Sequence, residues 1–126
     1  MIDNERRLRG MLGFAMRAGK IQIGTELVCR SMPTKAAPKL VVISLGASAA
    51  TKKKLTTKCE FYGIKKVQID MSTDELGTLL GKTYSPAAIG IMDEGFAKEI
   101  EKLSNSSNDT TDGRNSAQRN ADGLSE

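Results

Sequence analysis

Several residue types are rare or missing in this sequence, and each absence removes a class of function. The 126 residues include no histidine and no tryptophan, and only two cysteines, Cys29 and Cys59. Without histidine the chain has no Cys/His zinc site, no triad that uses histidine and no Cys–His nucleophile pair. We expect the two single cysteines to be reduced thiols that are at least partly buried. The sequence therefore predicts a protein without a metal site, a cofactor or catalytic residues.

Long hydrophobic runs are also missing. No stretch approaches the roughly 18 apolar residues of a membrane span, and the first residues do not form a secretory signal. We therefore expect a cytoplasmic protein that does not enter a membrane. Its 126 residues are enough for one domain with a substantial core and too few for two.

Acidic residues are fewer than basic ones, and the excess of positive charge is unevenly spread. The chain has 19 basic and 15 acidic residues, a net charge of +4. The last 23 residues hold two basic and four acidic side chains, so residues 1–103 carry a net charge of +6. A compact domain with this charge suggests a polyanionic partner.

The C-terminal segment has too few hydrophobic residues to form a core. Residues 104–126 are rich in Ser, Asn, Asp, Thr and Gly, and Leu124 is their only large aliphatic residue. Such a segment cannot bury enough apolar surface to offset the entropy lost on ordering. We predict a folded domain at residues 1–103 and a disordered polar tail at residues 104–126.

The remaining sequence alternates between helical and strand patterns. Hydrophobic spacing predicts helices at residues 3–17, 25–32 and 49–62, with two more after residues 72 and 92, and strands at residues 20–23, 40–45, 66–70 and 87–92. Asp3 is expected to cap the first helix, and Ser72 with Glu75 has the spacing of a capping box. Tyr62 is expected to face inward. Strands separated by helices predict an α/β fold, a three-layer α/β/α sandwich around a small mixed four-stranded sheet.

The first predicted helix has two different faces. An apolar stripe is formed by Leu8, Met11, Leu12, Ala15 and Met16. The other side is basic and carries two glycines, which lower helix stability: Arg6, Arg9, Gly10, Gly13 and Arg17.

Residues 18–30 are the most informative part of the chain. One helix is expected to end at Gly19 and another to begin at Gly24 and Thr25. The first N–H groups of a helix have no partner within it, so this start is a candidate anion site. Arg30 follows about a turn and a half later on roughly the same face. An ordinary helix start without a ligand is the alternative interpretation, and the pattern alone leaves it open.

Short segments then occur in the order and spacing of a known family. They are residues 15–20, 24–30, 40–43, 51–55, 75–77 with Gly81 and Lys82, and 89–97. Together they resemble the small ribosomal-protein-type RNA binders of the L7Ae/L30e superfamily, especially its bacterial YlxQ branch. The resemblance implies non-catalytic binding of structured RNA, such as a kink-turn or a related internal loop. It also implies a ribosome-associated protein or a ribonucleoprotein component.

In such proteins the start of the second helix and the loop before the last strand form the RNA face. By position, the resemblance assigns this role to Lys20, Gly24, Thr25, Glu26, Leu27, Arg30, Lys82, Tyr84, Ser85, Pro86 and Ala87. The N–H groups of Gly24 and Thr25 would hold phosphate, and Arg30 would offer its guanidinium to a guanine edge. Because only 4% of the residues are aromatic, a folded RNA suits this chain better than stacked single strands.

One pair of residues departs from the family pattern. The strongest kink-turn binders have Asn-Glu where this sequence has Glu26-Leu27. An ionised glutamate only accepts hydrogen bonds, and leucine neither donates nor accepts them. Two alternatives therefore stay open for this chain, which we expect to be a monomer. One is a protein–protein interaction module of the same fold with little RNA affinity, and the other is a small enzyme or ligand-binding domain.

Overall fold

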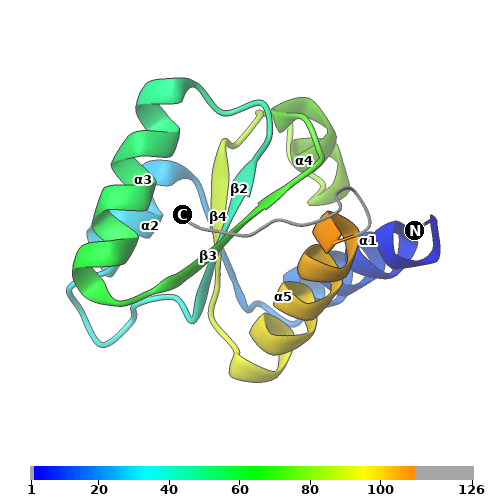
Figure 1. The fold of residues 1–126 in the computed structure, drawn as a ribbon, viewed down its shortest axis with the longest axis horizontal. Coiled ribbons are helices and arrows are strands. Elements are labelled where there is room, and N and C mark those ends of the chain that lie inside the picture. The colour runs from blue at the N-terminus through cyan, green and yellow to red at the C-terminus, as the bar shows by residue number, and fades with distance from the viewer. Residues whose placement is uncertain (1, 110–126) are drawn as a thin grey trace.

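Four strands form one mixed sheet that is covered by helices on both faces (Figure 1). The computed structural model describes residues 2–109. The elements are α1 (Ile2–Arg17), β1 (Ile21–Ile23), α2 (Thr25–Ser31), β2 (Leu40–Ser44), α3 (Ala49–Tyr62), β3 (Lys65–Ile69), α4 (Thr73–Leu79), β4 (Ala88–Ile91) and α5 (Glu94–Asp109). The strand order in the sheet is β1-β4-β2-β3.

The strand directions create one edge where most of the connections meet. β2 pairs in parallel with β3, whereas β4 is antiparallel to both β1 and β2. β1, β2 and β3 therefore end at the same edge of the sheet, and β4 begins there. We call this the carboxyl edge. The chain leaves it at Gly24, Leu45 and Asp70 and enters it at Ala87.

Two separate cores hold the layers together. α2 and α3 cover one face of the sheet, and α1, α4 and α5 cover the other (Figure 1). Along the central strand β2, Val41 and Ile43 pack in the core under α2 and α3, while Leu40 and Val42 pack in the core under the other three helices. Because β2 is buried on both faces, its sequence is apolar at almost every position. The predicted three-layer fold is confirmed.

Local capping signals explain where two helices begin. The Ser72 hydroxyl accepts a hydrogen bond from the Glu75 N–H at 3.0 Å, and the Glu75 carboxylate accepts one from the Ser72 N–H at 2.9 Å. This is the predicted capping box, which satisfies two otherwise unpaired N–H groups. α3 begins in a similar way at Ser48, whose hydroxyl accepts from the Thr51 N–H at 3.2 Å. It ends at Gly63, whose left-handed backbone (φ 68°) suits glycine.

Two predictions about helix residues are wrong. α1 already includes Ile2, so Asp3 lies within the helix and not at the predicted N-cap position. Tyr62 is 38% exposed, because α3 stops at this residue and its last turn runs past the core that buries Leu55 and Cys59.

The predicted domain boundary also changes. α5 continues to Asp109, past the predicted boundary at residue 103, and Ser104 is buried at 2% exposure. Once a helix is nucleated by packing, adding residues to it costs little, even where their own helix propensity is modest. Residues 110–126, the remainder of the predicted tail, lie outside the described part of the chain.

Candidate functional site

A main-chain hydrogen bond joins the two segments that the sequence assigned to one site. The Gly24 N–H donates to the Ala88 carbonyl at 2.9 Å, which extends the pairing of β1 with β4 beyond Ile23. The neighbouring Ala87 carbonyl accepts from the Ser44 N–H at 2.8 Å. The start of α2 and the end of the connection from α4 to β4 therefore lie side by side at the carboxyl edge.

α2 turns three of the predicted site residues outward. Glu26, Leu27 and Arg30 are exposed, whereas Val28 and Cys29 are buried against the sheet. Residues three and four positions apart share a helix face, so Arg30 lies on the face of Glu26 and Leu27. In the described part of the chain no ion pair joins Glu26 to Arg30. The structure therefore leaves the Arg30 guanidinium available to a partner.

The predicted phosphate contact of Gly24 is wrong. Its N–H is already bonded to the Ala88 carbonyl, because the β1–β4 ladder continues one residue past β1. Gly24 has φ 109°, a value that favours glycine, so the residue is needed to turn the chain from β1 into α2. α2 itself has only seven residues. Contacts of α2 with a ligand are therefore expected from its exposed side chains.

A buried glycine sets the path of the connection between α4 and β4. Gly77 lies in α4, and a Cβ atom there would collide with the Tyr84 carbonyl oxygen and come within 3.3 Å of Pro86 Cδ. The Ser85 hydroxyl also donates a hydrogen bond to the Asp74 carboxylate. These contacts hold the connection against α4 while leaving the Tyr84 side chain 53% exposed.

Three other predicted residues of this connection are less accessible than Tyr84. Lys82 and Ala87 are half-buried, and Pro86 is buried. Ala87 packs against the core under α2 and α3, and the Lys82 N–H donates to the Gly77 carbonyl at 2.9 Å. Pro86 therefore shapes the connection from within, whereas Thr83, Tyr84 and Ser85 are exposed.

The structure places Lys20 away from the other predicted site residues. The Lys20 N–H donates to the Ala15 carbonyl at 2.9 Å, where α1 ends, and its carbonyl accepts from the Met92 N–H at 2.8 Å. β1 separates Lys20 from Gly24 by four residue steps, on the order of 13 Å. Lys20 therefore lies at the edge of the sheet opposite the carboxyl edge.

Leu45 belongs to the carboxyl edge, and sequence reasoning missed it. The run of apolar residues predicted a strand through residue 45, but β2 ends at Ser44, whose hydroxyl donates to the Met71 carbonyl at 2.7 Å. Leu45 is 47% exposed. The only sequence signal is Gly46, which follows directly and interrupts the apolar pattern. We call six of the exposed side chains in this region the carboxyl-edge surface: Glu26, Leu27, Arg30, Leu45, Thr83 and Tyr84. Asp70 and Ser85 are also exposed near this edge.

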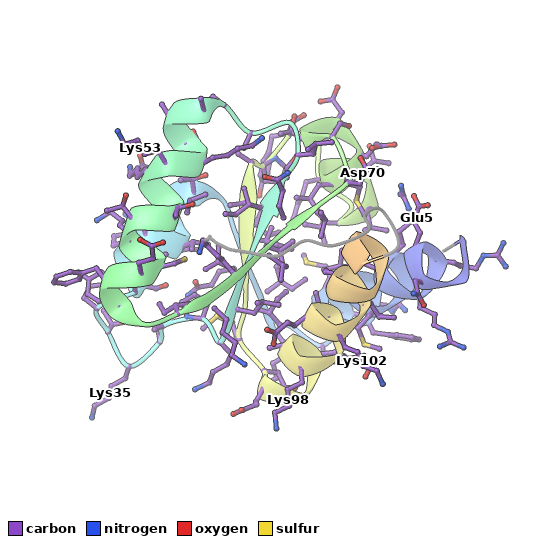
Figure 2. The ribbon with its side chains drawn as sticks, in the orientation of Figure 1. Glu5, Lys35, Lys53, Asp70, Lys98 and Lys102 are labelled. Carbon is purple, nitrogen blue, oxygen red and sulfur yellow. The ribbon has the colours of Figure 1, made fainter. Side chains whose placement is uncertain are left out.

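Positive charge is not concentrated at this surface. Lys35, Lys53, Lys98 and Lys102 extend outward in different directions, from the α2–β2 connection, α3 and α5 (Figure 2). The carboxyl-edge surface instead combines one arginine, one glutamate and three large apolar side chains. Such a mixture favours recognition of particular groups over general attraction to charge.

The two cysteines are free thiols within the core under α2 and α3, as predicted. Burial raises the pKa of the Cys59 thiol to about 11. The thiol therefore stays protonated at neutral pH, although the thiolate is the reactive and metal-binding form. None of the described helices is long and apolar enough to cross a membrane.

The sheet order, the two helical layers and the joined segments at the carboxyl edge define a small three-layer α/β/α domain. The sequence profile of the Ribosomal protein L7Ae/L30e/S12e/Gadd45 family matches residues 6–101, and the chain belongs to this family. The match includes all four strands and both segments of the candidate site.

Named relatives match over most of their own length. The chain is 34% identical over 100 residues to the RNA-binding protein YlxQ of Enterococcus faecium, covering 79% of this chain and 93% of that protein. It is 35% identical over 92 residues to the large ribosomal subunit protein eL30 of Sulfolobus acidocaldarius, covering 73% and 88%. A solved structure of a Bacillus halodurans protein of unknown function has a TM-score of 0.72 and 32% identity, covering 78% and 96%. The predicted resemblance to this family and its YlxQ branch is confirmed.

Proposed function

We propose that this protein binds structured RNA without catalysing a reaction, and that the carboxyl-edge surface makes the specific contacts. The observation that carries the proposal is the Gly24–Ala88 hydrogen bond, which brings α2 beside the end of the α4–β4 connection. Exposed side chains from both segments then share one edge of the fold. The names of two relatives, an RNA-binding protein and a ribosomal protein, support RNA as the ligand.

The side chains of this surface suit an RNA with unstacked bases. The Arg30 guanidinium is exposed and has no carboxylate partner in the described structure, so its paired donors are free for the O6 and N7 atoms of a guanine. Leu27 and Tyr84 offer apolar surface to a base that has left the stack. Internal loops expose such bases, whereas the major groove of a regular RNA helix hides its base edges.

The finer assignment is a kink-turn or a related internal loop, bound by a monomer in the cytoplasm as part of a ribosome-associated particle or another ribonucleoprotein. Glu26 and Leu27 limit the affinity for a standard kink-turn. An ionised Glu26 repels phosphate and donates no hydrogen bond, and Leu27 makes no polar contact with a base.

The test is a titration of one kink-turn RNA and one plain RNA duplex with three proteins. Arg30→Ala should weaken kink-turn binding by about 1–3 kcal/mol, as expected when an interaction with a base edge is removed. It should leave folding nearly unchanged, because Arg30 is exposed. Glu26→Asn combined with Leu27→Glu should strengthen kink-turn binding through new polar contacts with bases, and it leaves the net charge unchanged because one carboxylate is removed and one is added.

Lys35→Ala is the matched control, since Lys35 is an exposed cation outside the carboxyl-edge surface. It should bind the kink-turn almost like the wild type. If Arg30→Ala and Lys35→Ala behave alike on both RNAs, and the double variant gains nothing, the carboxyl-edge surface is not the specific RNA site.

A protein-interaction module of the same fold is the second candidate. Leu27, Leu45 and Tyr84 are 40%, 47% and 53% exposed at this edge, and exposed apolar side chains of this kind also suit a protein partner. RNA that copurifies with the wild-type protein and is lost from Arg30→Ala would decide for the RNA interpretation. A purified protein that binds neither RNA in the titration would decide for the protein partner.

A further inference from the structure

The outer face of α1 forms a cationic stripe that the carboxyl-edge surface does not use. The stripe consists of Arg6, Arg7, Gly10, Gly13, Phe14 and Arg17. Helical spacing places these residues opposite Leu8 and Leu12, which are buried in the core. The three arginines, Gly10 and Phe14 are exposed. Residues 6–20 contain five basic residues and no acidic one.

Carboxylates flank the stripe, and in the sequence Asp3 stands three and four residues before Arg6 and Arg7. On the side toward α4, Arg9 lies 3.4 Å from Glu5 and 3.9 Å from Glu75. On the side toward α5, Glu99 lines a shallow hollow beside Met11. In the described structure no ion pair involves an arginine of the stripe.

Phe14 is the large apolar side chain of the stripe, and it contacts Arg17. The Arg17 guanidinium lies over the Phe14 ring, 5.0 Å from its centroid, and one of its nitrogens lies 3.7 Å from the position of a Cβ on Gly13. This cation–π contact places a guanidinium and an aromatic face side by side. Phe14, in the last turn of α1, is 56% exposed.

Packing does not explain why a glycine stands at position 10. A Cβ atom at Gly10 would have nothing within 4 Å, so alanine fits there and would strengthen the helix. Gly77 differs, because its Cβ would collide with the α4–β4 connection. What the glycine at position 10 provides is a bare stretch of helix between the arginines, where another molecule can approach the backbone closely.

We propose that the α1 stripe binds the sugar–phosphate backbone of duplex RNA, as a second surface separate from the carboxyl-edge surface. Guanidinium groups bind phosphate oxygens through paired donors, and the bare helix at Gly10 lets the strand come close. Arg6 and Arg17 are separated by about 17 Å along the helix, which is long enough to reach more than one phosphate. Lys20 follows α1 directly and extends the positive charge at its end.

A nucleic-acid backbone fits the stripe better than a protein partner does. The core of a protein interface is depleted of charge and rich in apolar side chains. The stripe has one large apolar side chain, Phe14, among three arginines. This inference rests on the proposed function only in taking RNA as the ligand.

The test compares two triple variants of equal charge change on a plain RNA duplex of about 16 base pairs over a series of salt concentrations. The first is Arg6→Gln, Arg7→Gln and Arg17→Gln. The second, the control, is Lys53→Gln, Lys54→Gln and Lys58→Gln on α3, on the other side of the sheet from α1 (Figure 2). The α1 variant should reduce the slope of log affinity against log salt by about 2–3, at about 0.7–0.9 for each phosphate that the variant no longer neutralises.

The control should change the salt slope by less than about one. Equal effects of the two triple variants would overturn the proposal, because they would show attraction to net charge alone. An α1 variant that binds the duplex like the wild type would also overturn it and would leave an acidic protein as the occupant of the stripe.

Gly10→Ala separates an effect on binding from an effect on stability. It should raise the melting temperature and yet weaken duplex binding several-fold, because the added methyl group keeps the strand away from the helix. Unchanged duplex affinity would overturn the close approach of the RNA strand at Gly10.

Arg30→Ala, measured in parallel on the kink-turn, separates the two proposals. Its effect tests the carboxyl-edge surface, and the effect of the α1 triple variant tests the stripe.

Discussion

The carboxyl-edge surface and the α1 stripe differ in both composition and construction. The carboxyl-edge surface gathers one arginine, one glutamate and three large apolar side chains from α2, the end of β2 and the α4–β4 connection. The α1 stripe is built from one helix and carries three arginines, two glycines and one phenylalanine. The first surface depends on tertiary contacts such as the Gly24–Ala88 bond, whereas the second depends on helical spacing alone.

This difference suggests a division of labour in RNA recognition. Contacts to phosphates position a protein on a nucleic acid, and contacts to bases specify the sequence or shape that is bound. Under the proposals above, the α1 stripe supplies affinity for any duplex and the carboxyl-edge surface selects an internal loop. Variants that damage one surface and spare the other therefore test the comparison directly.

The largest expected effect comes from Gly77→Ala. Because the new Cβ would collide with the Tyr84 carbonyl oxygen, this change should lower the free energy of unfolding by about 1–3 kcal/mol. It should also displace the α4–β4 connection. At a temperature where the variant is folded, kink-turn binding should fall while duplex binding remains. Chemical denaturation and the two RNA titrations measure these effects. Gly10→Ala is the control, because the same substitution at that position should raise the stability. Wild-type stability of Gly77→Ala would contradict the tight contact.

A smaller effect is expected from Tyr84→Ala. The Tyr84 ring is 53% exposed at the carboxyl edge, so it can stack on an unpaired base. Its removal should weaken kink-turn binding by about 1–2 kcal/mol and leave duplex binding unchanged. Tyr84→Phe should retain the affinity, and Phe61→Ala, which removes a 79% exposed ring from the end of α3, should have no effect. Equal losses on the kink-turn and the duplex would remove the distinction between the two surfaces.

The smallest effect concerns α4, which lies between the two surfaces. Ser72→Ala removes one half of the capping box and should lower the free energy of unfolding by about 1 kcal/mol. Binding of both RNAs should stay unchanged, because Ser72 belongs to neither surface. Glu75→Ala should lower stability too, because it removes the other half of the box. A large loss of affinity for either RNA in Ser72→Ala would show that the orientation of α4 controls that surface.

Most of the fold was predictable because its signals are local. The capping box at Ser72, the apolar stripe of α1 and the continuous apolar run of β2 each depend on residues that are close in sequence. The errors occur where packing decides the outcome. Tyr62 has the spacing of an inward residue, but α3 runs past its core there. Helix α5 continues beyond residue 103 although the composition changes at that point.

The candidate site was predictable only in part, and for the same reason. Helical spacing places Arg30 on one face with Glu26 and Leu27, and this face is exposed in the structure. It does not show that the Gly24 N–H is used by Ala88, that Pro86 is buried, or that Lys20 lies at the opposite edge. Each of these facts depends on which strands are neighbours in the sheet.

By itself, the sequence determined the alternation of helices and strands, the reduced and buried cysteines, the family and the cationic face of α1. The alternation, the cysteines and the cationic face follow from composition or from periodicity within one element, which requires no knowledge of distant neighbours. The family follows from the resemblance that short segments carry in their order along the chain. Only the tertiary structure decided that α2, Leu45 and Tyr84 share one edge, and that Gly77 leaves no room for a Cβ while Gly10 is free of packing constraints. The physical reason is that a hydrogen bond such as Gly24–Ala88, or a clash such as that at Gly77, exists only once the sheet order has brought remote segments together.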